Sequence, residues 1–168
     1  MAILSNDLHK AINTVWDAST LNATFRLLWN TTTHPAASYP VLHDSEASPN
    51  QPFPYCIFDQ MSVDISSRMS GEGAAGRQEI HNLMFQFRIH AKSVSGDDRD
   101  AKQIAYDMAE EVVKVFGGHP TTAPTAITMD TNKHVITQLL SDVGERTGDE
   151  EYRVDLDYLF RIDVPMAA

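Results

Sequence analysis

Cysteine, basic residues and long apolar runs are all scarce in this 168-residue chain. The only cysteine, Cys56, has no partner for an internal disulfide and lies in an apolar run, Tyr55 to Phe58, so we interpret it as a small buried hydrophobe rather than a reactive thiol. No stretch reaches the ~18 apolar residues that cross a bilayer, and the first residues lack the basic and apolar regions of a signal peptide. We therefore expect a soluble protein that is made inside the cell and does not enter a membrane.

The shortage of basic residues gives the chain a strongly acidic balance. Its 13 Lys and Arg residues face 23 Asp and Glu residues, which gives a net charge of −10 at pH 7. A protein that binds duplex nucleic acid needs Lys and Arg to neutralise phosphates, so this balance argues against that class. It suits a solvated surface, or one past which a polyanion moves without being held.

The hydrophobic pattern changes its period near the middle of the chain. Residues 83–91 alternate between apolar and polar side chains, as in a strand with one buried face. After the polar connection 95–98, apolar residues recur at helical spacing from Ile104 to Phe116, and glycines followed by Pro120 end that helix. The pattern predicts a sheet with a long helix laid on it.

The remaining segments complete an α+β prediction. A helix is expected over residues 4–18, and the apolar segment 24–29 is too short to assign. Further strands are expected over residues 55–65, 125–129, 134–140 and 152–164. Because the last strand has one charged face, we expect a mostly antiparallel sheet, with one long helix packed on it and an N-terminal helix. The length fits a single domain over residues 1–168.

Two segments are predicted to be extended surface loops. Residues 30–54 carry five prolines, which disfavour helix and most strand pairing, and residues 66–77 are rich in glycine and serine. We expect both loops to be too polar to fold into the core. They are candidates for ordering against a partner, and ordinary surface disorder is the alternative.

One glycine pattern resembles a cofactor motif. Gly71 to Gly76 fits G-x-G-x-x-G, and Asp97 or Asp98 lies about where a ribose-binding acid would follow. That motif requires the last glycine to open a helix whose N-terminus holds the pyrophosphate. Here the following residues alternate as a strand, so we interpret the glycines as a loop between strands. A small-molecule or nucleotide-binding α+β domain remains the alternative from another class.

No other cluster indicates catalysis, a metal or a cofactor. His81 and His90 are an odd number of residues apart on one strand, so they face opposite sides of the sheet and cannot share an ion. The acids at residues 97–100 are expected to stabilise the start of the long helix. The acids near Gly144 and Gly148 are expected to form a solvated hairpin tip. We predict that the protein is not an enzyme and has no cofactor or metal.

The order of these elements resembles one known family. An N-terminal helix precedes a Pro-rich connection ending in Pro52-Phe53-Pro54-Tyr55, then a strand, a small-residue loop and a long aromatic strand. A helix ending at Phe116 and a charged terminal hairpin follow. This order resembles the tail terminator, or tail completion, proteins of long-tailed bacteriophages. Other neck, connector or tail tube components of similar shape are the structural alternative.

The resemblance implies a homo-oligomeric ring, a hexamer in that family, at the head-proximal end of the tail tube. Such a ring ends tube polymerisation, contacts the tail tube protein and the head-tail connector or stopper protein, and lets DNA pass without specific binding. It implies a virion location after synthesis in the host cytoplasm. Candidate residues for neighbouring-subunit or lumen contacts are Arg68, Gly71, Glu72, Gly73, Gly76 and Arg77. Candidates for partner contacts are His43, Asp44, Glu46, Asn50 and Gln51.

Overall fold

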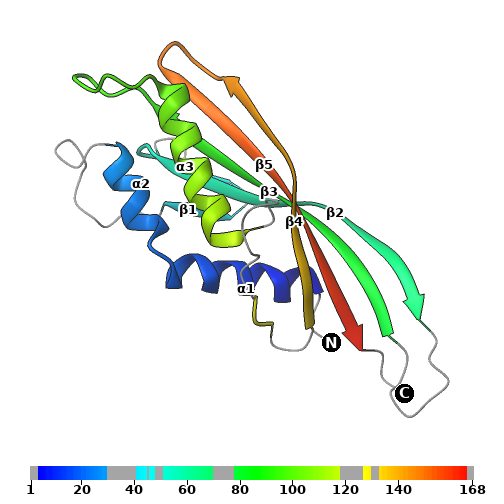
Figure 1. Ribbon diagram of the computed structural model, residues 1–168. Coiled ribbons are helices and arrows are strands. Elements are labelled where there is room, and N and C mark those ends of the chain that lie inside the picture. The colour runs from blue at the N-terminus through cyan, green and yellow to red at the C-terminus, as the bar shows by residue number, and fades with distance from the viewer. Residues whose placement is uncertain are drawn as a thin grey trace.

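The computed structural model describes residues 4–29, 41–44, 46–47, 51–69, 78–117, 127–129 and 133–165. Within these ranges the chain forms the helices and strands labelled in Figure 1. They follow in the order α1 (Leu4–Ala18), α2 (Leu21–Trp29), β1 (Leu42–Asp44), β2 (Tyr55–Met69), β3 (Gln78–Lys92), α3 (Ala101–Phe116), β4 (Lys133–Arg146) and β5 (Glu151–Pro165). None of these helices is long and apolar enough to cross a membrane.

The strands form one sheet in the order β1-β2-β3-β5-β4. Only β1 pairs in parallel, with residues 56–58 of β2; the other neighbours are antiparallel. This is an α+β fold with a mostly antiparallel sheet, which confirms the fold class expected from the alternating patterns.

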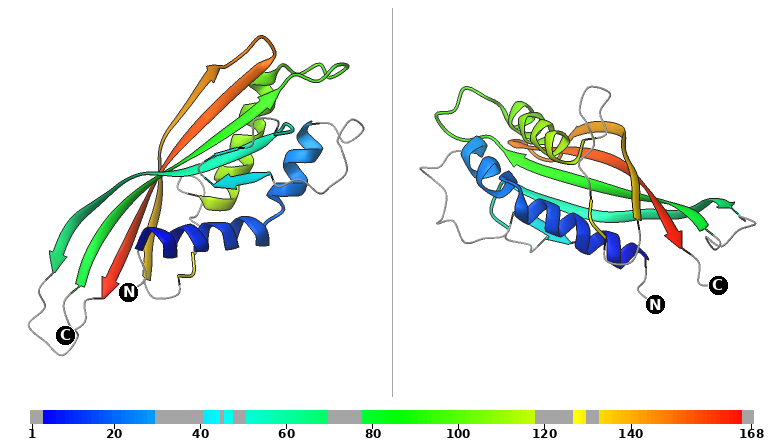
Figure 2. Two further views of the ribbon diagram at one scale, coloured as in Figure 1. Left: turned by 180° about the vertical axis from the view of Figure 1, so that it is seen from behind. Right: turned by 60° about the horizontal axis from the view of Figure 1, so that its bottom comes forward.

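The helices cover one face of this sheet, and none of the described helices lies on the opposite face (Figures 1 and 2). On β3, residues Leu83, Phe85, Phe87, Ile89 and Ala91 point into the helix layer and are at most 1% exposed. Helix α3 lies along β3 and β5. The end of β2, the beginning of β3 and the end of β5 extend past the helices, so part of the sheet lies beyond the core (Figure 1).

Aromatic rings join the helices to the sheet. Phe87, fully buried near the middle of β3, lies with its ring centroid 4.9 Å from that of Phe116 on α3 and 6.4 Å from that of Trp16 on α1. Its centroid is also 6.0 Å from that of Phe58 on β2 and 5.6 Å from that of Tyr158 on β5. Such aromatic packing contributes a large share of core stability, and Phe87 contacts the largest number of elements through it.

The ends of α3 follow the expected chemistry with one correction. Asp100 is the N-cap, since its carboxylate accepts a hydrogen bond from the Gln103 amide at 2.8 Å. Gly117 ends the helix at φ 72°, a region that favours glycine. Asp97, predicted to stabilise the helix start, instead binds the Arg99 side chain.

Several predicted boundaries were wrong. The unassigned segment before Trp29 is the helix α2, and residues 127–129 do not form a strand. Residues 42–44 form β1 within the predicted loop 30–54, and Val41 beside them is fully buried, so this part of the loop does enter the core. β2 continues to Met69, so the second loop begins later than residue 66. β4 continues to Arg146, which leaves residues 147–150 as the hairpin tip.

Gly144 on β4 lies beneath two tyrosine rings. A Cβ atom at this position would lie 2.6 Å from the Tyr106 hydroxyl oxygen and 2.8 Å from atoms of the Tyr152 ring. Real Cβ atoms do not approach so closely, so both rings would have to move. We expect Gly144→Ala to lower the free energy of unfolding by roughly 1–3 kcal/mol in urea denaturation, as overpacking does.

Gly148→Ala is the matched control for this substitution. A Cβ atom there would come no closer than 3.4 Å to the Glu151 side chain, which is flexible. We expect its unfolding midpoint to stay near that of the wild type. Equal midpoints for the two variants would contradict a close contact between the tyrosines and Gly144.

Candidate assembly surfaces

The helix-free face of the sheet is built from the strand residues that point away from the helices. On β3 these are the even-numbered positions, and on β5 the odd-numbered ones, because neighbouring strands pair in register. Among the residues whose side chains the structure describes, the charged ones on this face are Asp59, Arg88, Lys92, Glu145, Glu151, Arg153, Asp155, Asp157, Arg161 and Asp163.

Cross-strand pairs bind nearly all of the cations on this face. Arg153 on β5 is 2.9 Å from both Glu145 on β4 and Asp155. Arg88 reaches Asp59 on β2 at 3.5 Å, and Lys92 lies 4.0 Å from Glu151. The Arg161 Nε donates to the Asn82 side-chain oxygen at 3.3 Å. Cross-strand charge pairs of this kind stabilise a sheet modestly, and they leave few cations free to bind a phosphate.

His90 lies among these charged residues, but its own side chain is uncharged at neutral pH. Burial, with the nearby cations of Arg153 and Arg88, lowers its pKa from 6.5 to about 4. Its ring stacks on that of Tyr55, with the centroids 4.6 Å apart and an interplanar angle of 12°. The imidazole is therefore neutral at pH 7. The four cations and six carboxylates of the face give a formal charge of −2 for each copy.

The edge strands carry exposed apolar side chains. Ile136, Leu140 and Val143 on β4 are 41%, 44% and 59% exposed, and Met61 on β2 is 56% exposed. The first three lie on β4, the last strand of the sheet, and Met61 lies on the part of β2 that β1 does not cover. Sequence reasoning missed this feature, because periodicity shows which residues alternate but not which strands lie at an edge.

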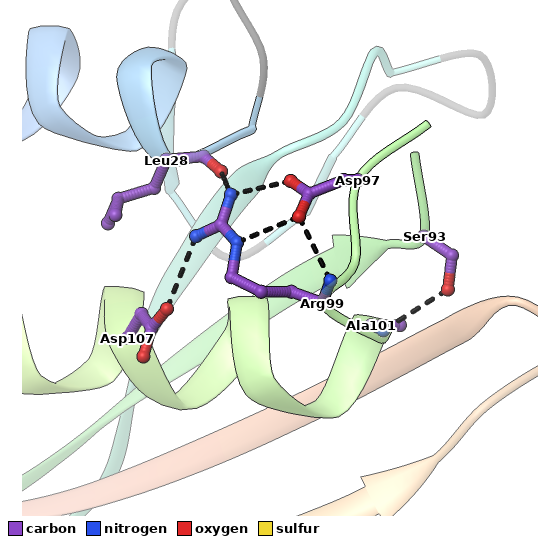
Figure 3. A network of polar contacts seen from close by, with 6 residues as sticks. All are labelled: Leu28, Ser93, Asp97, Arg99, Ala101 and Asp107. Atoms are coloured by element: carbon purple, nitrogen blue, oxygen red, sulfur yellow. Dashed lines mark hydrogen bonds and ion pairs between the residues drawn. The ribbon is translucent and has the colours of Figure 1, made fainter. Parts of the chain in front are cut away.

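A network of hydrogen bonds around Arg99 joins the C-terminal end of α2 to the N-terminal end of α3 (Figure 3). The Arg99 guanidinium donates to the Leu28 carbonyl oxygen at 2.6 Å, to the Asp97 carboxylate at 2.7 Å and to Asp107 at 3.2 Å. The hydrogen bonds from Arg99 lower the pKa of Asp97 from 3.8 to about 2. Arg99 therefore caps the end of α2 from the start of α3.

We expect Arg99→Ala to lower the free energy of unfolding at pH 7 by about 1–3 kcal/mol, since the charged hydrogen bond to Leu28 is lost. The pKa of Asp97 is lower in the folded chain than in the unfolded one, so its contribution is present above pH 4 and is lost as the pH falls toward 2. We expect chemical denaturation at a series of pH values to show that the variant loses less free energy of unfolding between pH 4 and pH 2 than the wild type does.

Lys114→Ala serves as the control, because its pairs with Glu110 and Glu111 are exposed on α3. It should leave both the stability at pH 7 and the acid window unchanged. An Arg99→Ala variant that loses as much stability as the wild type between pH 4 and pH 2 would contradict the assigned role of Asp97.

The predicted partner-contacting residues lie around β1. His43 and Asp44 belong to this strand, and Asp44 is 3.0 Å from His9 on α1. The His43 ring lies edge-on to that of Tyr55. Glu46 is exposed just beyond β1, and Gln51 precedes β2. Asn50 lies outside the described residues.

The predicted inter-subunit or lumen loop is described only at its start. Arg68 belongs to β2, with its backbone opposite Glu79 of β3, so its placement in a loop was wrong. Gly71, Glu72, Gly73, Gly76 and Arg77 lie outside the described residues. The described chain resumes as the strand β3, as the alternation after the glycines predicted.

Other chemistry in the described part of the chain is limited. Cys56 is fully buried, and burial raises the pKa of its thiol well above 9.0, so it is unreactive, as expected. No group of three His, Cys, Asp or Glu residues in the described ranges could hold a metal ion. A surface hollow of about 290 Å³ near the β4–β5 tip is lined by charges of both signs, including Lys102, Arg146 and Glu150. Small-molecule sites are lined mainly by hydrophobic and aromatic residues, whereas most of the residues around this hollow are charged.

Comparison with known proteins gives a likeness of fold. No protein-family model and no curated protein matches the sequence. Among solved structures, a chain from the virion of a native gene transfer agent (GTA) particle is similar, with a TM-score of 0.57 and 16% identity. The match covers 97% of this chain and 99% of that chain. At this identity the likeness concerns the fold alone, and it extends over nearly the whole of both chains.

Proposed function

We propose that this chain is a virion structural protein of the tail terminator type. It would form a ring at the head-proximal end of the tail tube, end polymerisation of the tube and join the tail to the head connector. The observation that carries this proposal is the end-to-end likeness of fold to a chain of a GTA virion. The order of α1, β3, α3 and the terminal β4–β5 hairpin is the order on which the resemblance to tail terminators rests.

The shape of the sheet supports an assembled state. One end of the sheet runs past the helices (Figure 1). Apolar side chains are exposed on β2 and β4, toward the two sides of the sheet. Exposed apolar surface of this kind marks interaction sites. Copies that associate head to tail generate a ring when the rotation between them closes.

The helix-free face suits the passage of DNA. Its formal charge is −2 for each copy, and its arginines and lysine are engaged in pairs or hydrogen bonds. A lumen lined by such a face repels phosphates and offers few free cations, so DNA would pass without being held. This role needs no catalytic group, cofactor or membrane contact.

The remaining candidate residues are proposed as contacts to partners. His43, Asp44, Glu46, Asn50 and Gln51 would contact the tail tube protein or the head connector. Arg68, Gly71, Glu72, Gly73, Gly76 and Arg77 would contact a neighbouring subunit or line the lumen. The protein would be made in the host cytoplasm as a single domain and become part of the virion.

The mass of the purified protein under native conditions tests the ring. We expect a closed oligomer, and a hexamer would have a mass of about 112 kDa, six times the 18.7 kDa of one chain. Negative-stain images should show rings with a central opening. A protein that stays monomeric at micromolar concentration would contradict the proposal.

Mixing with tail tube protein separates a terminator from a tube component. A tube component would itself polymerise on a growing tube, whereas a terminator should form rings alone and stop the tube from lengthening. We expect tubes grown with a substoichiometric amount of this protein to be shorter, with one ring at one end. Tubes of unchanged length would contradict a role in termination.

A further inference from the structure

At each side of the sheet, one long stretch of strand has no neighbouring strand in the described part of the chain. In the described part of the chain, β4 has β5 on one side and no strand on the other. On the opposite side, β1 pairs only with residues 56–58 of β2, so no strand within the described ranges lies along the outer edge of β2 from Asp59 onward. Open edges present rows of unpaired N–H and C=O groups to any other strand, and proteins usually block them with proline or short strands. Neither residues 59–69 of β2 nor residues 133–146 of β4 include a proline.

The two open edges carry matching irregularities. Bulges leave Met61 and Ser66 of β2 without a partner on β3, and Val135 and Leu140 of β4 without a partner on β5. The two bulged positions are five residues apart in each strand. The central strands β3 and β5 pair with each other without any such shift.

The bulges give the two edges equal length at the same height of the sheet. The nine residues 59–67 of β2 lie alongside the seven residues 80–86 of β3. Residues 133–141 of β4 set nine residues against the seven residues 157–163 of β5, which are the partners of the same part of β3. A strand without bulges has fewer residues over this height than either edge, so its residues would fall out of step with those of the edge. The two edges have the same number of residues over this height and can pair residue by residue.

We infer that β4 of one copy pairs with the open edge of β2 of the next copy. The alternation of directions across the sheet makes β2 and β4 antiparallel, so the added pair continues the antiparallel sheet. Nine residues on each side pair without a further bulge, which places Ser62 opposite Gln138 and Asp59 opposite Ser141. This inference rests on the proposed ring and names the surfaces that join its subunits.

The pairing also accounts for two of the exposed apolar residues. Met61 and Leu140 lie at the bulges on the two edges. In the proposed register they are offset by one residue, so the neighbouring strand would cover each of them. Because the two edges differ, the contact is head to tail and leaves no open edge once the ring closes. The bulky helix layer then lies on the outside, where there is more room, and the helix-free face lines the lumen.

Cysteine cross-linking tests this seam. Ser62 and Gln138 are both exposed, and residues opposed across an antiparallel pair have Cβ atoms ~4.5–5.5 Å apart, close to the span of a disulfide. The native Cys56 is buried and does not compete. We expect mild oxidation to link Ser62→Cys copies to Gln138→Cys copies as dimers. The double variant should give a ladder of covalent oligomers up to the closed ring.

Val143→Cys replaces Gln138→Cys in the matched control. Val143 is exposed, as Gln138 is, but lies five positions further along β4, where the proposed register places it away from Ser62. We expect at least tenfold less cross-linking with Ser62→Cys. Hydrogen exchange of the wild type gives a second readout, in which the outer amides of residues 59–67 and 133–141 should be protected in the oligomer.

The outcomes separate this inference from the proposed function. A ring by native mass in which these amides exchange freely, or in which Val143→Cys links as well as Gln138→Cys, would overturn the seam and leave the ring standing. A monomer would overturn both. Protection of the edges only after an unrelated extended peptide is added would show strand addition by a different partner and would also overturn the inference.

Discussion

Replacing Phe87 by alanine is expected to lower the free energy of unfolding by ~3–5 kcal/mol. Its ring is fully buried and packs on aromatic rings from α1, α3, β2 and β5, so truncation leaves a cavity where four elements meet. Domains of this size are stable by only ~5–15 kcal/mol, so the variant should lose much of its stability. Thermal and urea denaturation, followed by circular dichroism, would measure the change.

Two further variants identify the cause. Phe87→Leu keeps an apolar side chain in the site and should cost roughly half as much as alanine. Leu27→Ala also truncates a large apolar side chain to alanine, but at a position that is 67% exposed, and should stay within ~0.5 kcal/mol of the wild type. If Phe87→Ala and Leu27→Ala changed the stability equally, Phe87 would not be the centre of the core.

The elements that the sequence predicted correctly share one physical property. β3, β5, α1 and α3 each bury one face, and burial imposes a period of two or 3.6 on the apolar residues. The end of α3 was also predictable, because Gly117 adopts a positive φ that glycine permits. Local chemistry was sufficient wherever one element alone decides the pattern.

The failures come from contacts that are distant in the sequence. β1 has only three residues in a proline-rich segment, and it exists because residues 42–44 find a parallel partner in β2. Asp97 binds Arg99, and the Arg99 guanidinium is held in place by the Leu28 carbonyl oxygen, 71 residues away in the sequence. Neither partner can be identified from spacing.

The candidate assembly surfaces were the least predictable part. The sequence gives the acidic balance, but it does not show that Glu145 and Asp155 meet at Arg153. The bulges at Met61 and Leu140 depend on how the strands pair. A bulge shifts one strand against its neighbour, and no residue type marks these positions.

Exchanging Glu145 and Glu151 for lysine is expected to turn a ring that releases DNA into one that retains it. Each exchange adds two positive charges, so the formal charge of the helix-free face changes from −2 to +2 for each copy. The glutamate side chains are 56% and 38% exposed, so the fold should tolerate the change. A DNA retention assay at ~50 mM salt should show no binding by the wild type, strong binding by the variant, and loss of that binding near ~200 mM.

Glu110→Lys with Glu111→Lys makes the same change of net charge on the opposite side of the molecule. Both residues lie on α3, in the helix layer that the proposed ring places outside. Duplex DNA inside a ring meets the cations of all copies at once, whereas DNA on the outside meets those of only a few. The retained complex should therefore be far more resistant to salt for the Glu145 and Glu151 variant. Equal salt dependence for the two variants would mean that net charge alone decides binding. That result would contradict the proposal that the helix-free face lines the lumen.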